Sequence, residues 1–253
     1  MILRRLASGI RRQDWFAVLT EFVIVVAGIV VAIQLDNWNE ARIRADRAVE
    51  YRARLAEDLR YDVTVMKRRN DYFGDVLNYA LDAEAALSNK DPAPGENPWE
   101  VIRAAYQAGQ AWPFAIFGAT YKELQSAGEL DLIGGAETMT LLSEYYDNGA
   151  FQYSYSVPPS PYRDMIRGRL PYALARYIAN SCEVSPTTNT QELRDCAEPE
   201  DTQDLAATVA ALRRDRAVLN ALRTHMSQVR VQRHLLTDLS KEALGLIEHL
   251  EGL

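Results

Sequence analysis

The longest apolar run of the chain lies near its N-terminus, where residues 15–33 read WFAVLTEFVIVVAGIVVAI. A helix rises about 1.5 Å per residue, so a run of this length crosses the roughly 30 Å hydrocarbon core of a bilayer. A cleaved signal peptide is the alternative, because basic residues precede the run. However, the run exceeds the roughly 7 to 15 residues of a signal core, and the QLDN that follows is no small-residue cleavage site. We therefore predict an uncleaved transmembrane helix over residues 15–35.

The residues that flank this segment predict its orientation. Trp15 and Trp38 bracket it, as interfacial aromatic anchors do. The first 13 residues contain four Arg and no acidic residue, whereas three Arg among residues 42–47 weaken the asymmetry on the other side. Basic residues favour the cytoplasmic side of a membrane. We expect residues 1–14 to form a basic cytoplasmic segment on the lipid headgroups and residues 36–253 to lie on the opposite side.

One ionisable residue, Glu21, lies inside the apolar segment, where a charged group is costly and usually faces protein or water. Helical spacing places it on one stripe formed by Ala17, Glu21, Val25, Gly28 and Ala32. Gly28 and Ala32 form a small-xxx-small pair, which allows another helix to approach closely. We expect this face to bind another transmembrane helix, from a second copy or from a different subunit. In the alternative interpretation, Glu21 reaches the nearer headgroups and Gly28 is incidental.

Two long polar stretches, residues 37–89 and 202–251, lack Pro and contain one Gly each. Hydrophobic residues recur at every seventh position, as Leu59, Met66, Phe73, Ala80 and Leu87 in the first stretch and as Leu222, Val229, Leu236, Ala243 and Leu250 in the second. This period predicts two long helices, the first of them able to continue the membrane segment. We expect them to pack antiparallel to each other. Pairing of each helix with its counterpart in a second copy stays open, and with it oligomerisation.

Shorter helices are predicted over residues 99–110, 118–127, 136–146 and 162–180. Gly128 is expected to end the second of these, and Pro171 to kink or split the last. Between them, Leu130, Leu132 and Ile133 are expected to enter the core from an extended turn. No segment alternates apolar and polar positions as a strand does. We predict an all-α fold in which an N-terminal transmembrane helix runs into a helical bundle.

The charge of the chain is unevenly distributed. The 253 residues have a formal net charge of −7, while the first 13 carry +4, which leaves −11 on the rest. Because the phosphates of nucleic acids require a basic surface, this acidic body argues against a nucleic-acid partner.

The chain contains two cysteines, Cys182 and Cys196, in a polar stretch. A bridge between them would close a short loop, and disulfides persist in oxidising compartments. We expect this disulfide, with two unrelated reduced thiols as the alternative. A zinc site is disfavoured, because no His lies near them and the C-x-x-C pattern is missing.

Two blocks, EFVIVVAGIVVAIQLDNWNE and TYKELQSAGELDLIGGAETMTLLSEYYD, resemble a bacterial family of single-pass membrane proteins known only as a domain of unknown function. The matching positions are Glu21, Gly28, Asn37, Trp38, Asn39, Glu40, Thr120, Tyr121, Leu124, Gly128, Leu130, Leu132, Ile133, Tyr145 and Tyr146. Asp36 departs from the family, where Asn is commoner. The resemblance implies an inner-membrane anchor with a helical domain in the periplasm, and it transfers no activity.

The sequence offers little catalytic chemistry. Three histidines, His225, His234 and His249, fall in the last predicted helix, and the separation of nine residues puts the first two on opposite faces. We interpret them as solvated or capping residues. No metalloprotease, nucleophile-elbow, phosphate-loop or dinucleotide motif is present, so we expect no catalytic residue, no metal and no cofactor.

An aromatic and proline-rich segment is the strongest remaining candidate for binding. It contains Tyr145, Tyr146, Phe151, Tyr153, Tyr155 and Tyr162. Tyrosine combines a large ring with a polar tip, which suits a partner or ligand surface; in the alternative, the rings cover the bundle. We expect a non-enzymatic interaction protein, an accessory, scaffold or assembly subunit of a membrane complex or homo-oligomer. The alternative function is a periplasmic ligand-binding or sensing module that signals through a partner.

Overall fold

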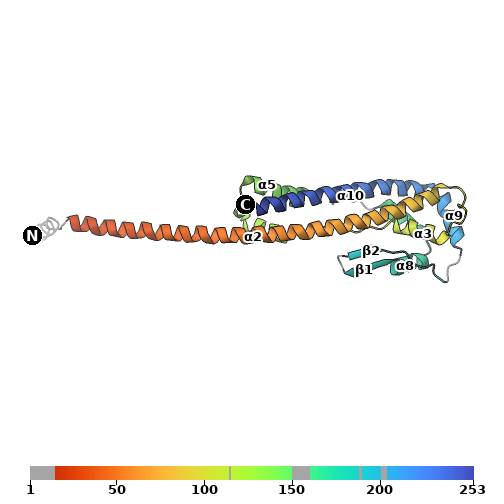
Figure 1. The fold of residues 1–253 in the computed structure, drawn as a ribbon, viewed down its shortest axis with the longest axis horizontal. Coiled ribbons are helices and arrows are strands. Elements are labelled where there is room, and N and C mark those ends of the chain that lie inside the picture. The colour runs from red at the N-terminus through yellow and green to blue at the C-terminus, as the bar shows by residue number, and fades with distance from the viewer. Residues whose placement is uncertain (1–14, 114, 150–159, 188–189, 201–203) are drawn as a thin grey trace, which may run out of the picture. The chain divides into compact units, whose positions relative to one another are not determined.

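In the computed structural model the chain divides into two compact units, residues 1–51 and 52–253, and each is described by itself. The structure describes residues 15–253 except 114, 150–159, 188–189 and 201–203 (Figure 1). The helices are α2 (Trp15–Ser88), α3 (Pro98–Gln107), α4 (Ala119–Ala127), α5 (Ala136–Ser143), α7 (Pro161–Arg169), α8 (Tyr172–Ser181), α9 (Leu205–Arg214) and α10 (Arg216–Glu251). Shorter elements are the 3-10 turn η1 (Leu130–Leu132), the π-helical turn η2 (Glu144–Gly149) and the strands β1 (Glu183–Thr187) and β2 (Thr190–Leu193). The predicted all-α class is confirmed.

Helix α2 is a single continuous helix of 74 residues, so the predicted continuity between the membrane segment and the following polar stretch is confirmed. No Pro interrupts it, and good helix formers dominate its polar part. Its five heptad positions, Leu59, Met66, Phe73, Ala80 and Leu87, are all buried in the second unit. The five heptad positions of the C-terminal stretch, from Leu222 to Leu250, are buried as well. The period-seven pattern therefore identified the core faces of both long helices.

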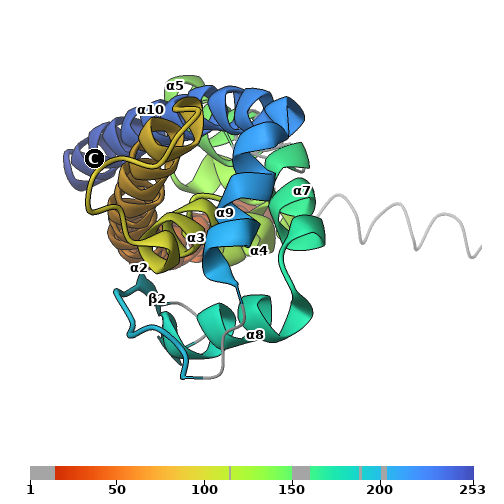
Figure 2. The same cartoon turned by 90° about the vertical axis from the view of Figure 1, so that its right-hand side faces the viewer.

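The two long helices of the second unit lie side by side and antiparallel (Figures 1 and 2). Side-chain pairs between the two helices show this direction, because the residue numbers of the partners on α10 decrease as those on α2 increase. In order along α2, the bridging pairs are Arg60 with Glu251, Asn70 with Arg233, and Glu84 with Arg223. The heptad faces therefore pair within one chain, as the first interpretation proposed.

The C-terminal stretch is not one helix of about 50 residues, which corrects the prediction. Asp215, with φ −85° and ψ 89°, separates α9 from α10. Its carboxylate accepts a hydrogen bond from the Ala217 N–H at 3.0 Å and caps the start of α10. An Asp at an N-cap accepts a hydrogen bond from an N–H that has no partner within the helix. This stabilises the start of a new helix at Asp215, although neither Pro nor Gly interrupts the sequence there.

A hydrophobic cluster joins the C-terminal half of α2 to α3, α7, α8, α9 and the start of α10 (Figure 2). Its members include Leu87, Ile102, Tyr162, Ile166, Ile178, Leu212 and Leu222. Leu170 and Pro171 separate α7 from α8, so the predicted split is confirmed. Gly128 ends α4 with φ 68° and ψ 27°, a left-handed conformation that suits Gly, as predicted.

A short hairpin, which the sequence did not predict, lies between the two cysteines. Strand β1 pairs antiparallel with β2, with Glu183 opposite Leu193. Cys182 and Cys196 form a disulfide with a Cα–Cα separation of 5.1 Å, so the predicted bridge is confirmed. Strands this short show too few positions for an apolar and polar alternation to be recognised. The bridge closes the loop in which they pair.

Candidate functional site

Among the described residues, one helix is long and apolar enough to cross a membrane. Within residues 18–88 of α2, an 18-residue window near the N-terminus has a mean hydropathy of 2.5, and none of its residues is buried. The large apolar side chains of this segment, such as Phe22 and Ile24, are exposed. So are the two flanking tryptophans, and the Arg42 guanidinium lies 5.8 Å from the centre of the Trp38 ring. This segment is a candidate membrane anchor.

The stripe predicted for contact with another helix lies on this continuous α2 segment. Glu21, Val25, Gly28 and Ala32 are exposed along it, and Ala17 belongs to the same helix. A Cβ atom added at Gly28 would meet nothing within 4 Å. Among the described residues Glu21 has no hydrogen-bond or ion-pair partner, whereas the nearby Thr20 hydroxyl donates to the Phe16 carbonyl at 2.7 Å. The stripe is uncovered, as is the rest of this segment, and it differs from the other faces in its carboxyl group and its small residues.

The aromatic residues predicted to form a surface divide into two groups. Phe151, Tyr153 and Tyr155 lie outside the described residues. Tyr145, Tyr146 and Tyr162 are buried, which corrects the expectation of an exposed partner surface for these three. The Tyr162 hydroxyl donates to the Ala105 carbonyl at 2.6 Å, so both its ring and its polar tip are satisfied inside the bundle.

A buried carboxyl group that the sequence analysis missed fixes the position of Tyr145. Asp62 is fully buried on α2 and accepts hydrogen bonds from the Tyr145 hydroxyl at 2.9 Å and from the Phe117 N–H at 2.8 Å. Burial raises the pKa of Asp62 to about 6, although both hydrogen bonds oppose this. The partners come from three distant parts of the chain, so no local pattern could have identified them.

Tyr146 and Tyr121 extend this cluster. Their rings stack with centroids 4.6 Å apart, and Tyr146 meets the Tyr145 ring edge-on at 4.9 Å. The Tyr121 hydroxyl donates to Asp147 at 2.8 Å, whereas the buried Tyr146 hydroxyl has no hydrogen-bond partner among the described residues. The cluster ties α4 and η2 to one stretch of α2.

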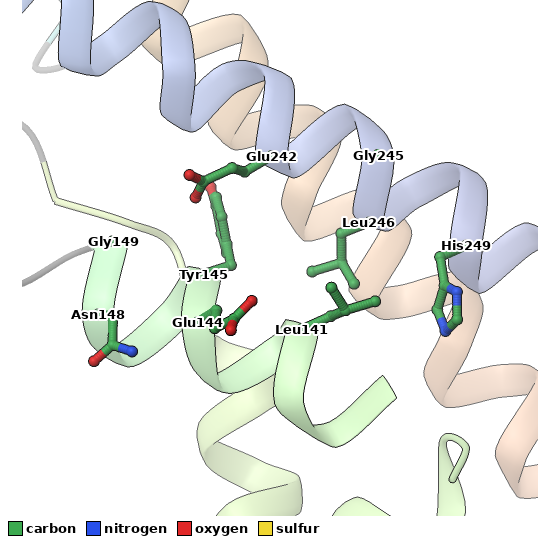
Figure 3. Close-up of a pocket in the computed structure, with 9 residues that line it drawn as sticks. All are labelled: Leu141, Glu144, Tyr145, Asn148, Gly149, Glu242, Gly245, Leu246 and His249. Atoms are coloured by element: carbon green, nitrogen blue, oxygen red, sulfur yellow. The ribbon is translucent and has the colours of Figure 1, made fainter. Parts of the chain in front are cut away.

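An open cavity of about 670 Å³ lies between α10 and the α5–η2 segment (Figure 3). It is lined by Leu141, Glu144, Tyr145, Asn148, Gly149, Glu242, Gly245, Leu246 and His249. Figure 3 shows the carboxylates of Glu144 and Glu242 on opposite sides of the Tyr145 ring, with Leu141 facing Leu246. Neither Glu144 nor Glu242 belongs to a motif that could be recognised in the sequence, and the packing of η2 beside α10 brings them together.

The three histidines have different surroundings. His234 is exposed beside Asp238, and His249 shares a hydrogen bond of 2.8 Å with Thr138. The expectation of a solvated or capping residue is wrong for His225, which is 5% exposed, bonded to Ser160 and stacked on Tyr162. Burial lowers the pKa of His225, which favours the neutral ring. Within the described residues no group of three or more His, Cys, Asp or Glu could hold a metal ion.

Comparisons with known proteins do not assign a family or a function to the chain. No protein-family model, no curated protein and no solved structure matches the chain. The resemblance to the bacterial membrane family therefore stays a prediction. Several positions of its second block, among them Tyr121, Leu132 and Tyr145, are buried in α4, η1 and η2.

Proposed function

We propose that the chain is a non-enzymatic interaction protein anchored in the bacterial inner membrane by one helix. Its role is that of an accessory, scaffold or assembly subunit of a membrane complex or a homo-oligomer. The N-terminus lies in the cytoplasm and residues 36–253 lie in the periplasm. The observation that supports the proposal is the stripe on α2, in which Glu21, without a partner among the described residues, shares a face with Gly28 and Ala32.

The physical argument rests on the cost of a carboxyl group in lipid. An ionisable side chain in the hydrocarbon region is expensive unless it finds a polar partner, water or the headgroups. A second helix relieves this cost when it approaches closely enough to share a hydrogen bond. Small residues permit that approach because the backbones can come together, and Gly28 has open space on this face.

We expect a cysteine introduced by Gly28→Cys to form a disulfide with the same cysteine of a second copy in native membranes under mild oxidation. The matched control is Val30→Cys, since two residues along a helix turn the side chain by about 200° to the opposite face. The measurement is the appearance of a reducible, higher-mass species on a denaturing gel. Absence of that species from Gly28→Cys, or equal crosslinking from Val30→Cys, would contradict self-association through this stripe.

The orientation is tested by labelling intact inner-membrane vesicles or spheroplasts with a membrane-impermeant maleimide. We expect Asn78→Cys, at an exposed position of α2, to be labelled from the outside of spheroplasts. Ser8→Cys, in the basic N-terminal segment, should be labelled only after the membrane is opened. The parent chain is the background control, because Cys182 and Cys196 are joined to each other and should react only after reduction. The reverse labelling pattern would place residues 36–253 in the cytoplasm.

A further inference from the structure

The cavity beside η2 has the dimensions of a small-molecule site. Its volume of about 670 Å³ falls within the usual range for ligand pockets. One wall is α10, which contributes Glu242, Gly245, Leu246 and His249, and the other is the end of α5 with η2 (Figure 3). Both walls belong to the second compact unit.

The charge of this cavity has one sign. Its lining within the described part of the chain includes two carboxylates, Glu144 and Glu242, and no Lys or Arg. Two basic residues of α10 and α2 have other acidic partners: Lys241 pairs with Asp238 and Arg60 with Glu251. Burial and the negative charges of Asp238 and Glu144 raise the pKa of Glu242. An uncompensated negative potential of this kind attracts cations and repels anions.

The remaining lining suits an organic cation better than a metal ion. Leu141 and Leu246 supply apolar surface, and the ring of Tyr145 lies between the two carboxylates (Figure 3). The methylene groups of an organic cation pack on apolar surface of this kind, which a metal ion does not use. The Tyr145 ring is held in place because its hydroxyl donates to the buried Asp62.

We propose that this cavity binds an aliphatic amine, with ammonium groups at Glu144 and Glu242 and the methylene chain against Leu141, Leu246 and the ring of Tyr145. The ligand class follows from the combination of an apolar lining with two carboxylates that have no ion-pair partner among the described residues. The sequence left ligand binding open as an alternative function, and this cavity gives it a location. Amine binding here is independent of the membrane-helix contact, so either can fail without the other.

The probe is 1,5-diaminopentane, which is doubly protonated near neutral pH and is small enough for the cavity. Titration calorimetry on the detergent-solubilised full chain is expected to show saturable binding at or below the millimolar range. The matched ligand control is 1,5-pentanediol, which has the same carbon chain without the charges. It should show no saturable heat over the same concentrations.

Two variants locate the site. In Gly245→Leu the new side chain enters the cavity wall, and the Cβ meets nothing within 4 Å, so the variant is expected to fold and to lose binding. Glu242→Gln removes one carboxylate and should weaken affinity about tenfold, as expected for a hydrogen bond to a charged group. Glu57→Gln is the matched control, because it removes the same charge from an exposed position of α2 outside the cavity lining.

The proposal is overturned by any of three results. These are no saturable binding of the diamine up to about 10 mM, equal affinity for the diol, or unchanged affinity in Gly245→Leu. Thermal unfolding of each variant without ligand separates loss of binding from loss of folding. If Gly245→Leu were to unfold, retention of parental affinity in Glu242→Gln would by itself overturn the proposal.

Discussion

Replacing Arg213 with methionine is expected to lower the free energy of unfolding by about 3 to 5 kcal/mol. Arg213 is almost fully buried on α9, where its guanidinium binds both carboxylate oxygens of Glu96 and its Nε donates to the Ala86 carbonyl at 3.1 Å. The side chains of Arg213 and Glu96 are 5% and 11% exposed. Methionine keeps much of the apolar packing but leaves the Glu96 carboxylate buried without a cationic partner, which is the costly part of breaking such a pair.

Denaturant unfolding of the full chain, followed by circular dichroism, measures this loss. The control is Lys67→Met, which breaks the ion pair of Lys67 with Asp71, whose side chains are 75% and 66% exposed. Exposed pairs of this kind contribute under about 1 kcal/mol because water and salt screen them. The double variant Arg213→Met with Glu96→Gln should recover part of the loss. A cost for Arg213→Met no greater than that of Lys67→Met would contradict the assigned role of the pair.

The second large effect is a dependence of stability on pH that comes from Asp62. Its pKa is about 6 in the folded chain against an ordinary value of 3.8, so the folded state binds the proton more tightly. The resulting stabilisation is complete below pH 3.8 and is lost as the pH rises through 6. At about 1.4 kcal/mol per pKa unit, this amounts to as much as about 3 kcal/mol.

The variant Asp62→Asn isolates this contribution. Its amide oxygen still accepts the Phe117 N–H, but it has no proton to gain. The free energies of unfolding of the parent and the variant are measured from pH 7 down to pH 4. As the pH falls over this range, the parent should gain up to about 3 kcal/mol of stability relative to the variant. Other acidic groups titrate in both chains, so the difference reports Asp62. Parallel pH profiles would show that Asp62 titrates at its ordinary pKa.

The parts of the fold that sequence predicted are those set by local patterns. The heptad positions that include Leu59 and Leu236 are buried because a helix returns the same face every seventh residue. Gly128 ends a helix because it can adopt a positive φ, and Pro171 interrupts one because it lacks an N–H. The disulfide followed from having two cysteines in one polar loop.

The parts that sequence could not predict depend on contacts between distant residues. Asp62 meets Phe117 and Tyr145 only after the helices have packed, so nothing near position 62 indicates a buried carboxyl group. His225 is buried by Ser160 and Tyr162 in the same way. The cavity likewise combines the α5–η2 segment with α10, and these elements are far apart in the sequence.

The antiparallel pairing of α2 with α10 has a consequence for the order in which the protein folds. Arg60 and its partner Glu251 are 191 positions apart in sequence. During synthesis α2 is made first, and the part of its apolar face that packs on α10 stays uncovered until residues 216–251 have left the ribosome. Contacts of such long sequence separation slow folding and expose apolar surface to aggregation. We therefore expect the bundle to be completed late, only after α10 has been synthesised, and the incomplete domain to be a substrate for chaperones and proteases until then.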